Sequence, residues 1–195
     1  MNKTLQNLII RALSGAVFVV LMLGAIWLSS FYFAIVFLAF TFLGLKEFYS
    51  LSSHQNGVKV NGWLAIAGGV LLFLIATGVS FLQWSPKWFA LYLIYIPILF
   101  IPELYRSVGT PIQNIAVSLM GHIYVAIPFT IFCLIEPISK ELVLAFFVLI
   151  WASDTGAYLV GVCIGKHKMF ERISPKKTWE GFFGGILFSV IAAIL

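Results

Sequence analysis

The sequence contains one long stretch without a single charged residue, from residue 12 to residue 45. These roughly 34 residues would form a helix of about 51 Å, whereas the hydrocarbon core of a bilayer is about 30 Å thick. The stretch therefore predicts two membrane-spanning helices rather than one. Ser29 and Ser30 lie near its middle, and they place the turn between helices near residues 10–29 and 31–51.

The overall composition supports a membrane location. Hydrophobic residues make up 62% of the 195 residues and charged residues only 10%, whereas soluble domains carry about 25% charged residues. So few charges cannot cover a water-facing surface, which argues against a soluble enzyme, a disordered chain and a nucleic-acid-binding domain. The net charge of +5 is interpreted as lysine and arginine retained in cytoplasmic loops.

Five further apolar stretches follow the first two. They cover residues 63–82, 88–105, 111–135 and 141–164, and a last one begins near residue 179. The stretch at 88–105 is short, and Pro97 and Pro102 are expected to kink or break it. The sequence thus predicts an all-α polytopic membrane protein with about seven spans. Residues 1–105 would form N-terminal transmembrane helices, and residues 106–195 middle helices with a basic cytoplasmic loop.

The distribution of lysine and arginine predicts the orientation. If the N-terminus lies in the cytoplasm and the spans alternate, only Lys87 and Lys140 fall in outside loops. Ten basic residues then fall in inside loops: Lys3, Arg11, Lys46, Lys59, Arg106, Lys166, Lys168, Arg172, Lys176 and Lys177. Since cytoplasmic loops carry an excess of lysine and arginine, we expect a cytoplasmic N-terminus.

Asp154 is an acidic residue inside a predicted span. It lies thirteen residues after Glu141, about 20 Å along the helix, which places it in the cytoplasmic half of the membrane. An aspartate at mid-membrane costs about 2.5–3.5 kcal/mol, so such a residue usually faces a bundle interior or a water-filled cavity. We favour a metal-associated or proton-handling carboxylate. The alternative is a structural residue that forms hydrogen bonds beside Ser153 and Thr155.

A basic loop connects the last two spans and ends where a helix begins. Ser174 is the expected N-cap of that helix, with Pro175 at its first position. Lys177 and Thr178 would lie in its first turn. Free N–H groups at a helix start, together with Lys176 and Lys177, can bind phosphate oxygens. The alternative is a loop that only follows the positive-inside rule and attracts lipid headgroups.

Two pairs of glycines flank this loop. Gly161 and Gly165 precede it, and Gly181 and Gly185 follow it, each pair with GxxxG spacing. This spacing permits close contact between membrane helices, so we expect tight packing of the helices on either side of the loop.

Three groups of residues in this region resemble a known family. They are Ser153–Tyr158 (Ser-Asp-Thr-Gly-Ala-Tyr), Gly165-Lys166, and Ser174–Gly181 (Ser-Pro-Lys-Lys-Thr-Trp-Glu-Gly) followed by Gly184-Gly185. These motifs are similar to those of the phosphatidate cytidylyltransferases, or CDP-diacylglycerol synthases. Weaker matches occur at residues 103–106 and 121–124 and at Pro128. The likeness extends over most of the chain and is diagnostic from about residue 151 to residue 185.

The resemblance implies a multi-pass enzyme of the bacterial inner membrane. Members of that family join CTP to phosphatidate with Mg²⁺ as cofactor and yield CDP-diacylglycerol and pyrophosphate. The implied partners are CTP, phosphatidate and membrane lipids, without nucleic acid, and a homodimer is one option for the assembly.

The resemblance also implies which residues form the site. Lys176 and Lys177 would hold the triphosphate, and Asp154 would lie in the polar cavity beneath it; these three are the expected catalytic residues. The expected substrate-binding residues are Ser174, Thr178, Glu180 and Lys166.

Part of the family pattern does not occur in these 195 residues. The family's signature contains a Lys-Arg segment, a Lys-Asp pair, His-Gly-Gly and Asp-Arg, and it supplies the metal-binding aspartates. The sequence also ends at Leu195, within an apolar helix. We therefore expect a truncated or split chain that lacks the catalytic C-terminal part and most Mg²⁺ ligands, with Asp154 as the remaining candidate ligand. Such a chain should turn over no CTP alone.

Three other functions stay open on the sequence. The chain could be part of a transporter or channel, with Asp154 as a coupling carboxylate and the lysines as an anion gate. It could be a CTP-dependent lipid kinase, which would transfer the terminal phosphoryl group instead of the cytidylyl group. It could also be a non-catalytic membrane protein.

Overall fold

The computed structural model describes the backbone of residues 3–55 and 57–194, and the side chains of residues 13, 15–55 and 57–194. The side chains of Lys3 and Arg11, which enter the charge count above, and Leu195 lie outside the described residues. The chain forms two compact units, Met1–Lys140 and Glu141–Leu195. The division of the spans after residue 105 stays a prediction.

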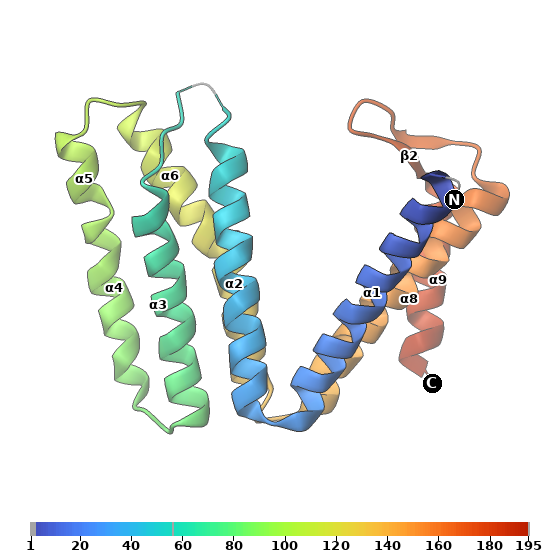
Figure 1. Ribbon diagram of the computed structural model, residues 1–195, viewed down its shortest axis with the longest axis horizontal. Coiled ribbons are helices and arrows are strands. Elements are labelled where there is room, and N and C mark those ends of the chain that lie inside the picture. Colours follow the sequence, from blue (N-terminus) through green and yellow to red (C-terminus); the bar gives the residue numbers. More distant parts are fainter. Residues whose placement is uncertain (1–2, 56, 195) are drawn as a thin grey trace. The chain divides into compact units, whose positions relative to one another are not determined.

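Helices dominate the described part of the chain (Figure 1). The first unit contains α1 (Lys3–Leu28), α2 (Ser30–Ser52), α3 (Gly62–Phe81), the 3-10 turn η1 (Pro86–Trp88), α4 (Phe89–Ile98), α5 (Phe100–Tyr105), α6 (Pro111–Gly121), the π-helical turn η2 (His122–Ala126) and α7 (Ile127–Ile135). Nearly all of α8 (Lys140–Ile164) belongs to the second unit, with the strands β1 (Lys168–Phe170) and β2 (Ser174–Thr178) and the helix α9 (Trp179–Ile194).

Five helical stretches are long and apolar enough to cross a membrane. They are Ser30–Ser52, Gly62–Phe81, Pro86–Tyr105, Pro111–Ile135 and Lys140–Ile164. Two shorter apolar helices, Gly15–Leu28 and Trp179–Ile194, lie where the first and last spans were expected. The predicted all-α polytopic membrane fold is confirmed, and the side of the membrane on which the N-terminus lies stays a prediction.

Two predicted interruptions in the helices are present. Ser29 is extended, with φ −167° and ψ 157°, and its Oγ accepts the backbone N–H of Tyr32 at 3.4 Å. This N-cap ends α1 and starts α2 at the expected turn. The fourth span is broken at Leu99, between α4 and α5, and each of these helices contains a proline. Pro97 and Pro102 have no N–H to donate to the preceding turn, which weakens the helix at this point.

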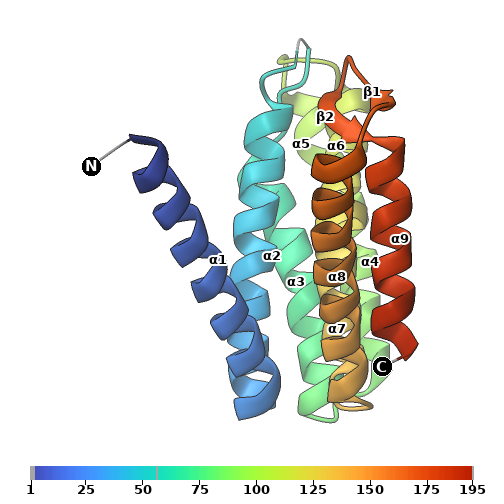
Figure 2. The ribbon, with the colours of Figure 1, turned by 90° about the vertical axis from the view of Figure 1, so that its right-hand side faces the viewer.

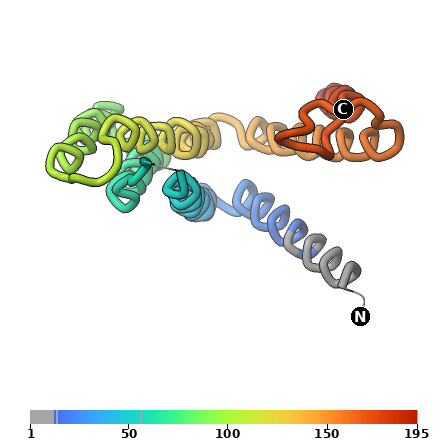
Figure 3. Tube along the Cα trace, turned by 90° about the horizontal axis from the view of Figure 1, so that it is seen from above, coloured from blue at the N-terminus to red at the C-terminus, as the bar shows by residue number. Residues whose placement is uncertain are grey.

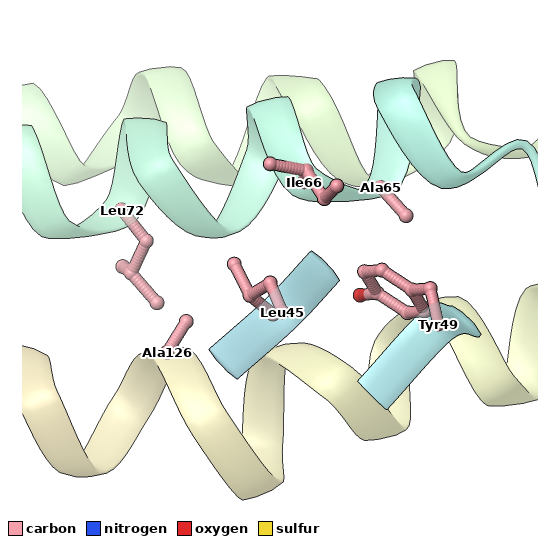
Figure 4. Packing of buried hydrophobic residues seen from close by; sticks show 6 residues of the cluster. All are labelled: Leu45, Tyr49, Ala65, Ile66, Leu72 and Ala126. Atoms are coloured by element: carbon pink, nitrogen blue, oxygen red, sulfur yellow. The ribbon is translucent and has the colours of Figure 1, made fainter. Parts of the chain in front are cut away.

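The core of the first unit lies between α2, α3 and η2. Figure 4 shows Leu45 and Tyr49 of α2 facing residues of α3, with Ala126 of η2 beside Leu45. The packing is close, because a Cβ added to Gly69 of α3 would lie 2.5 Å from Leu45 Cδ1. The six residues of this buried cluster are Leu45, Tyr49, Ala65, Ile66, Leu72 and Ala126.

Polar side chains buried in the first unit are paired with one another and with the backbone. The Nε2 of His122 donates to Ala65 O at 2.7 Å, so its Nδ1 accepts from the Tyr92 hydroxyl at 2.9 Å. Asn114 donates from Nδ2 to Glu103 at 2.8 Å, and its Oδ1 accepts the backbone N–H of Lys59 at 2.7 Å. These bonds hold the helices and one loop of the unit in register.

Candidate functional site

The two helices of the second unit are in direct backbone contact along a row of glycines. A Cβ on Gly184 of α9 would lie 2.5 Å from Val160 Cβ and 2.9 Å from Gly156 O. A Cβ on Gly181 would lie 2.8 Å from Ala157 O. Helices can approach this closely only where the facing residues are small, so the predicted tight packing on either side of the loop is confirmed. Figure 2 and Figure 3 show α9 running beside α8.

A short antiparallel hairpin connects these helices. We call "the hairpin" β1, β2 and residues 171–173 between them. Lys168 pairs with Thr178, and Phe170 pairs with Ser174. The hairpin is closed at its base, where Trp179 N donates to His167 O at 2.9 Å. The lysines of the loop are therefore carried on a defined strand.

The expectation that Ser174 is the N-cap of the last helix is wrong. Ser174–Thr178 is strand β2, and α9 begins at Trp179. The cap is Thr178, which is buried and whose Oγ1 accepts the backbone N–H of Gly181 at 3.2 Å. The segment offers two hydroxyl residues four positions apart as caps, and pairing with β1 selects the second. Lys176 and Lys177 consequently precede the helix instead of lying in its first turn.

A pocket of about 770 Å³ lies between α8, α9 and the hairpin. Small and apolar residues of the two helices, such as Gly161, Gly185 and Ile186, form part of its wall, and the hairpin contributes Lys176 and Lys177. Cavities of this size hold small-molecule ligands when a few polar groups converge on them. This pocket brings together five of the seven predicted site residues: Asp154, Ser174, Lys176, Lys177 and Thr178.

Asp154 is the acidic residue that lines this pocket. It lies on α8, ten residues before the helix ends at Ile164, which corresponds to about 15 Å along the axis. The side chain is exposed, and no described residue forms a hydrogen bond or ion pair with its carboxylate. Its negative charge is therefore available to a ligand in the pocket.

The positive charges of the pocket come from the hairpin. Lys168, Lys176 and Lys177 line it and are exposed. Among residues 13, 15–55 and 57–194, no carboxylate forms an ion pair with any of the three. Unpaired ammonium groups at the rim of a concave, partly apolar surface attract anions more strongly than they would on an open surface. The pocket is thus suited to a ligand with several negative oxygens.

Glu180 and Lys166 have other positions. Glu180 accepts the backbone N–H of Lys166 at 3.1 Å and that of His167 at 3.2 Å, and it pairs with His167 Nδ1 at 2.5 Å. These contacts tie the start of α9 to the segment that follows α8. Neither residue lines the pocket, so Glu180 fixes the base of the hairpin, and the substrate roles of both residues stay predictions.

On the hairpin, the sequence reasoning did not single out Lys168 and Met169, which line the pocket. Lys168 entered only the count of basic residues. The available signal was the distance between residues 168–170 and 174–178, which is short enough for a hairpin. Pairing then places Lys168 opposite Thr178, so the lysine lies beside the residues that the motif identified.

The residues of the pocket do not make a complete magnesium site. In the described residues there is no group of three or more His, Cys, Asp or Glu side chains that could hold a metal ion. Asp154 is the single carboxylate of the pocket, and Mg²⁺ is usually bound through one or two carboxylates with water and phosphate oxygens. Asp154 alone can thus supply at most two oxygen ligands to such an ion.

The weaker motif matches lie in the first unit, where their side chains are engaged. Glu103 is buried and forms an ion pair with Arg106 at 3.0 Å. His122 is buried in η2 and bonded as described above. These contacts stabilise the helices of the first unit, and they give no independent sign of a ligand.

Comparison with known proteins identifies the family. The sequence model of the cytidylyltransferase family matches residues 9–195. The chain belongs to the cytidylyltransferase family. The match includes both units, so the first unit is part of the cytidylyltransferase fold as well as the second. No solved structure matches the chain.

Several bacterial proteins are similar to part of the chain. The phosphatidate cytidylyltransferase of Staphylococcus epidermidis is 42% identical over 83 residues, which are 43% of this chain and 32% of that protein. Those of Staphylococcus haemolyticus and Staphylococcus aureus are 41% identical over 83 residues and 42% identical over 82 residues. The matched region covers 32% of the length of each of these curated relatives, which is about a third.

Proposed function

We propose that this cytidylyltransferase acts on CTP and phosphatidate and forms CDP-diacylglycerol and pyrophosphate. In this proposal the second unit supplies the pocket for the phosphate groups. The observation that carries it is the convergence of Asp154, Ser174, Lys176, Lys177 and Thr178 on one pocket. The names of the staphylococcal relatives support the choice of phosphatidate as the lipid.

The proposed chemistry needs little from the protein besides position and charge. An oxygen of the phosphatidate phosphate attacks the α-phosphorus of CTP, the bond to the β-phosphate oxygen breaks, and pyrophosphate leaves with the electron pair. Catalysis of such transfers consists mainly of alignment and stabilisation of negative charge. Lys176 and Lys177 would neutralise phosphate oxygens, and the hydroxyl of Ser174 would donate a hydrogen bond to one of them.

The charge pattern of the pocket would also orient the nucleotide. The lysines lie on the hairpin, whereas Asp154 lies about 15 Å from the end of α8. A triphosphate would be attracted to the lysines and repelled by the carboxylate, so its charged end would stay near the hairpin. Asp154 would then face the less charged part of the substrates.

The location is part of the same proposal. The excess of lysine and arginine in alternate loops supports a pocket that opens on the cytoplasmic side of the bacterial inner membrane. CTP would enter from the cytoplasm, and phosphatidate from the adjacent leaflet among the other membrane lipids. We also propose that the protein assembles as a homodimer.

Nucleotide binding is the first test. The purified chain in nanodiscs should bind labelled CTP saturably in equilibrium dialysis. Lys176→Gln should weaken binding by about 10- to 150-fold, because it removes one charge-assisted contact of roughly 1.5–3 kcal/mol. Lys87→Gln, which changes an exposed lysine of the first unit, is the matched control and should leave affinity unchanged. Equal affinities of both variants, or no saturable binding, would contradict the proposed pocket.

The fate of the label is the second test. The complete reading frame, expressed from its own gene, is incubated with phosphatidate and CTP labelled at either the α- or the γ-phosphate, and the 195-residue chain, which is expected to turn over no CTP alone, is the comparison. The proposal predicts that α-label enters the lipid and that γ-label leaves as pyrophosphate. Transfer of γ-label to lipid would instead identify a CTP-dependent lipid kinase. Binding of CTP without transfer of either label would favour a transporter or a non-catalytic protein, and Asp154→Asn would then be tested for an effect on transport.

A further inference from the structure

The tip of the hairpin carries two exposed apolar side chains. Phe170 is 57% exposed and Ile173 is 77% exposed. The two strands have three and five residues, and among the residues that the structure describes no third strand pairs with them. A two-stranded hairpin is marginally stable in water when it does not pack on another surface. A second surface that packs against these exposed apolar side chains would therefore stabilise the hairpin.

The exposed tip lies outside the lining of the pocket. Lys168 and Met169 line the pocket, whereas residues 170–173 do not. Met169 is less exposed than Lys168 and Phe170, and the register of the two strands is irregular between Lys168 and Phe170. If the tip were a lid that closes over the substrate, Phe170 and Ile173 would line the pocket. They do not, so the tip does not have the arrangement of a lid.

The charge of the hairpin indicates the nature of that surface. Between Gly165 and Thr178 there are five basic residues and one acidic residue, Glu171, which gives a net charge of +4 without histidine. In the part of the chain that the structure describes, none of the five forms an ion pair. The basic residues are Lys166, Lys168, Arg172, Lys176 and Lys177. A surface complementary to this segment is negatively charged and also accepts apolar side chains.

We propose that the tip of the hairpin inserts into the anionic surface of the lipid bilayer that holds the protein. Phe170 and Ile173 would enter the boundary between headgroups and acyl chains, and Arg172 would contact lipid phosphates. The hairpin joins two apolar helices of the same unit, α8 and α9, which places it where these helices leave the membrane. The inserted tip anchors the hairpin beside the leaflet, and this anchoring requires only a membrane-embedded chain, not the proposed reaction.

A fluorophore at the tip tests the proposal. Ile173→Cys is made in a Cys163→Ala background, because Cys163 is exposed and the other cysteine is buried. The thiol is labelled with an NBD dye, and the chain is reconstituted in nanodiscs of phosphatidylcholine or of an equimolar mixture with phosphatidylglycerol. Quenching by aqueous iodide and by nitroxide lipids is measured without nucleotide. A dye at Gln55→Cys, in an exposed loop of the first unit, is the control for aqueous access.

The proposal predicts that phosphatidylglycerol protects the dye at position 173 from iodide and exposes it to nitroxide lipids, while the dye at position 55 stays accessible. Arg172→Gln should lower the ratio of inserted to free tip by about fivefold, the contribution of one basic residue at an anionic surface. Glu171→Gln should raise that ratio, and added salt should lower it. A second dye position, Phe170→Cys, repeats the measurement independently.

Three results would overturn the proposal. The first is equal iodide quenching at position 173 in neutral and anionic nanodiscs. The second is protection that appears only when CTP is added, which would make the tip a lid. The third is protection that requires two chains in one nanodisc, which would make the tip a contact between copies.

Discussion

The row of glycines between α8 and α9 provides a matched pair of substitutions with opposite expected effects. Gly161→Ala and Gly184→Ala add the same methyl group to helix interiors at the same interface. A Cβ at Gly161 would lie 3.4 Å from Thr178 Oγ1 and 3.6 Å from Gly181 Cα, which are ordinary contacts. A Cβ at Gly184 would lie 2.5 Å from Val160 Cβ, so the helices must move apart.

The distances give the expected magnitudes. Replacing glycine by alanine in a helix interior stabilises it by about 0.5–1 kcal/mol, and Gly161→Ala should keep most of that gain. Overpacking costs about 1–3 kcal/mol. Gly184→Ala should have a cost near the upper end of this range, because the added methyl group would clash with Val160 Cβ and with the backbone oxygen of Gly156 at 2.9 Å. Neither atom is the end of a flexible side chain. After the helix gain is subtracted, Gly184→Ala should destabilise the second unit by about 2 kcal/mol, or roughly 30-fold in its opening equilibrium.

Hydrogen exchange measured by mass spectrometry on the chain in nanodiscs tests this difference. Peptides from residues 153–164 and 179–194 should exchange about 30-fold faster in Gly184→Ala and no faster in Gly161→Ala. Peptides from α2 and α3 provide the internal reference, since they belong to the other compact unit. The same exchange rates in both variants would show that the two helices are not in backbone contact at Gly184.

Two further predictions concern single side chains. Thr178→Ala should destabilise the second unit by about 1 kcal/mol, because it removes the N-cap of α9. In the same exchange assay, Thr178→Ser should restore most of that loss. Equal effects of alanine and serine would refute the capping role. Glu136 is buried in the first unit, where its carboxylate accepts one bifurcated hydrogen bond from Ser30 Oγ, at 3.1 Å to each oxygen, and pairs with Lys140 at 3.5 Å. Glu136→Ala should destabilise this unit, because it leaves the Ser30 hydroxyl without its partner. In a Cys163→Ala background, the temperature at which the buried thiol of Cys133 reacts with a fluorogenic maleimide should therefore fall by several degrees. An unchanged reaction temperature would contradict this.

The spans could be predicted because their signals are local. Hydropathy and length identify each stretch, and residues such as Ser29 and Pro102 interrupt a helix through their own backbone chemistry. Each predicted span boundary depended on a few neighbouring residues, and the structure places helices at the same positions. The family resemblance was equally local, since it depended on three short groups of residues.

The helix start after the basic loop could not be predicted in the same way. Ser174 and Thr178 are both good caps, and the sequence near them does not distinguish the two. The choice depends on pairing of Ser174 with Phe170 across the hairpin, which is a tertiary contact. The position of Glu180 could not be predicted for the same reason, because its partners lie thirteen and fourteen residues earlier in the chain. The motif identified residues that lie together, and the fold determines which of them face the pocket.

The π-helical turn η2 was not expected, and its position explains how the fifth span keeps one face buried. Asn114, Ser118, His122, Ala126 and Thr130 are buried at intervals of four residues. In an α-helix four residues overshoot one turn by about 40°, so such a row would rotate away from its neighbours. A π-turn has more residues per turn and rotates the row back. The row therefore stays against α2 and α3, to which Ser118 O is bonded through the Tyr49 hydroxyl at 2.7 Å and His122 through Ala65 O.

The two units consequently use polar residues for different purposes. In the first unit, within residues 15–55 and 57–140, Thr130 is the single buried polar side chain without a hydrogen bond, and residues such as Glu103 are bonded on more than one side. Groups satisfied in this way stabilise helix packing and have little capacity left for a ligand. In the second unit the packing depends on glycines, whereas Asp154, Lys176 and Lys177 have no partner among the described residues. Asp154 lies within a span, where an unpaired carboxylate is costly to retain unless it has a function, and the exposed lysines of the hairpin line the same pocket. This contrast is the physical argument for the proposal that the second unit binds the phosphate groups.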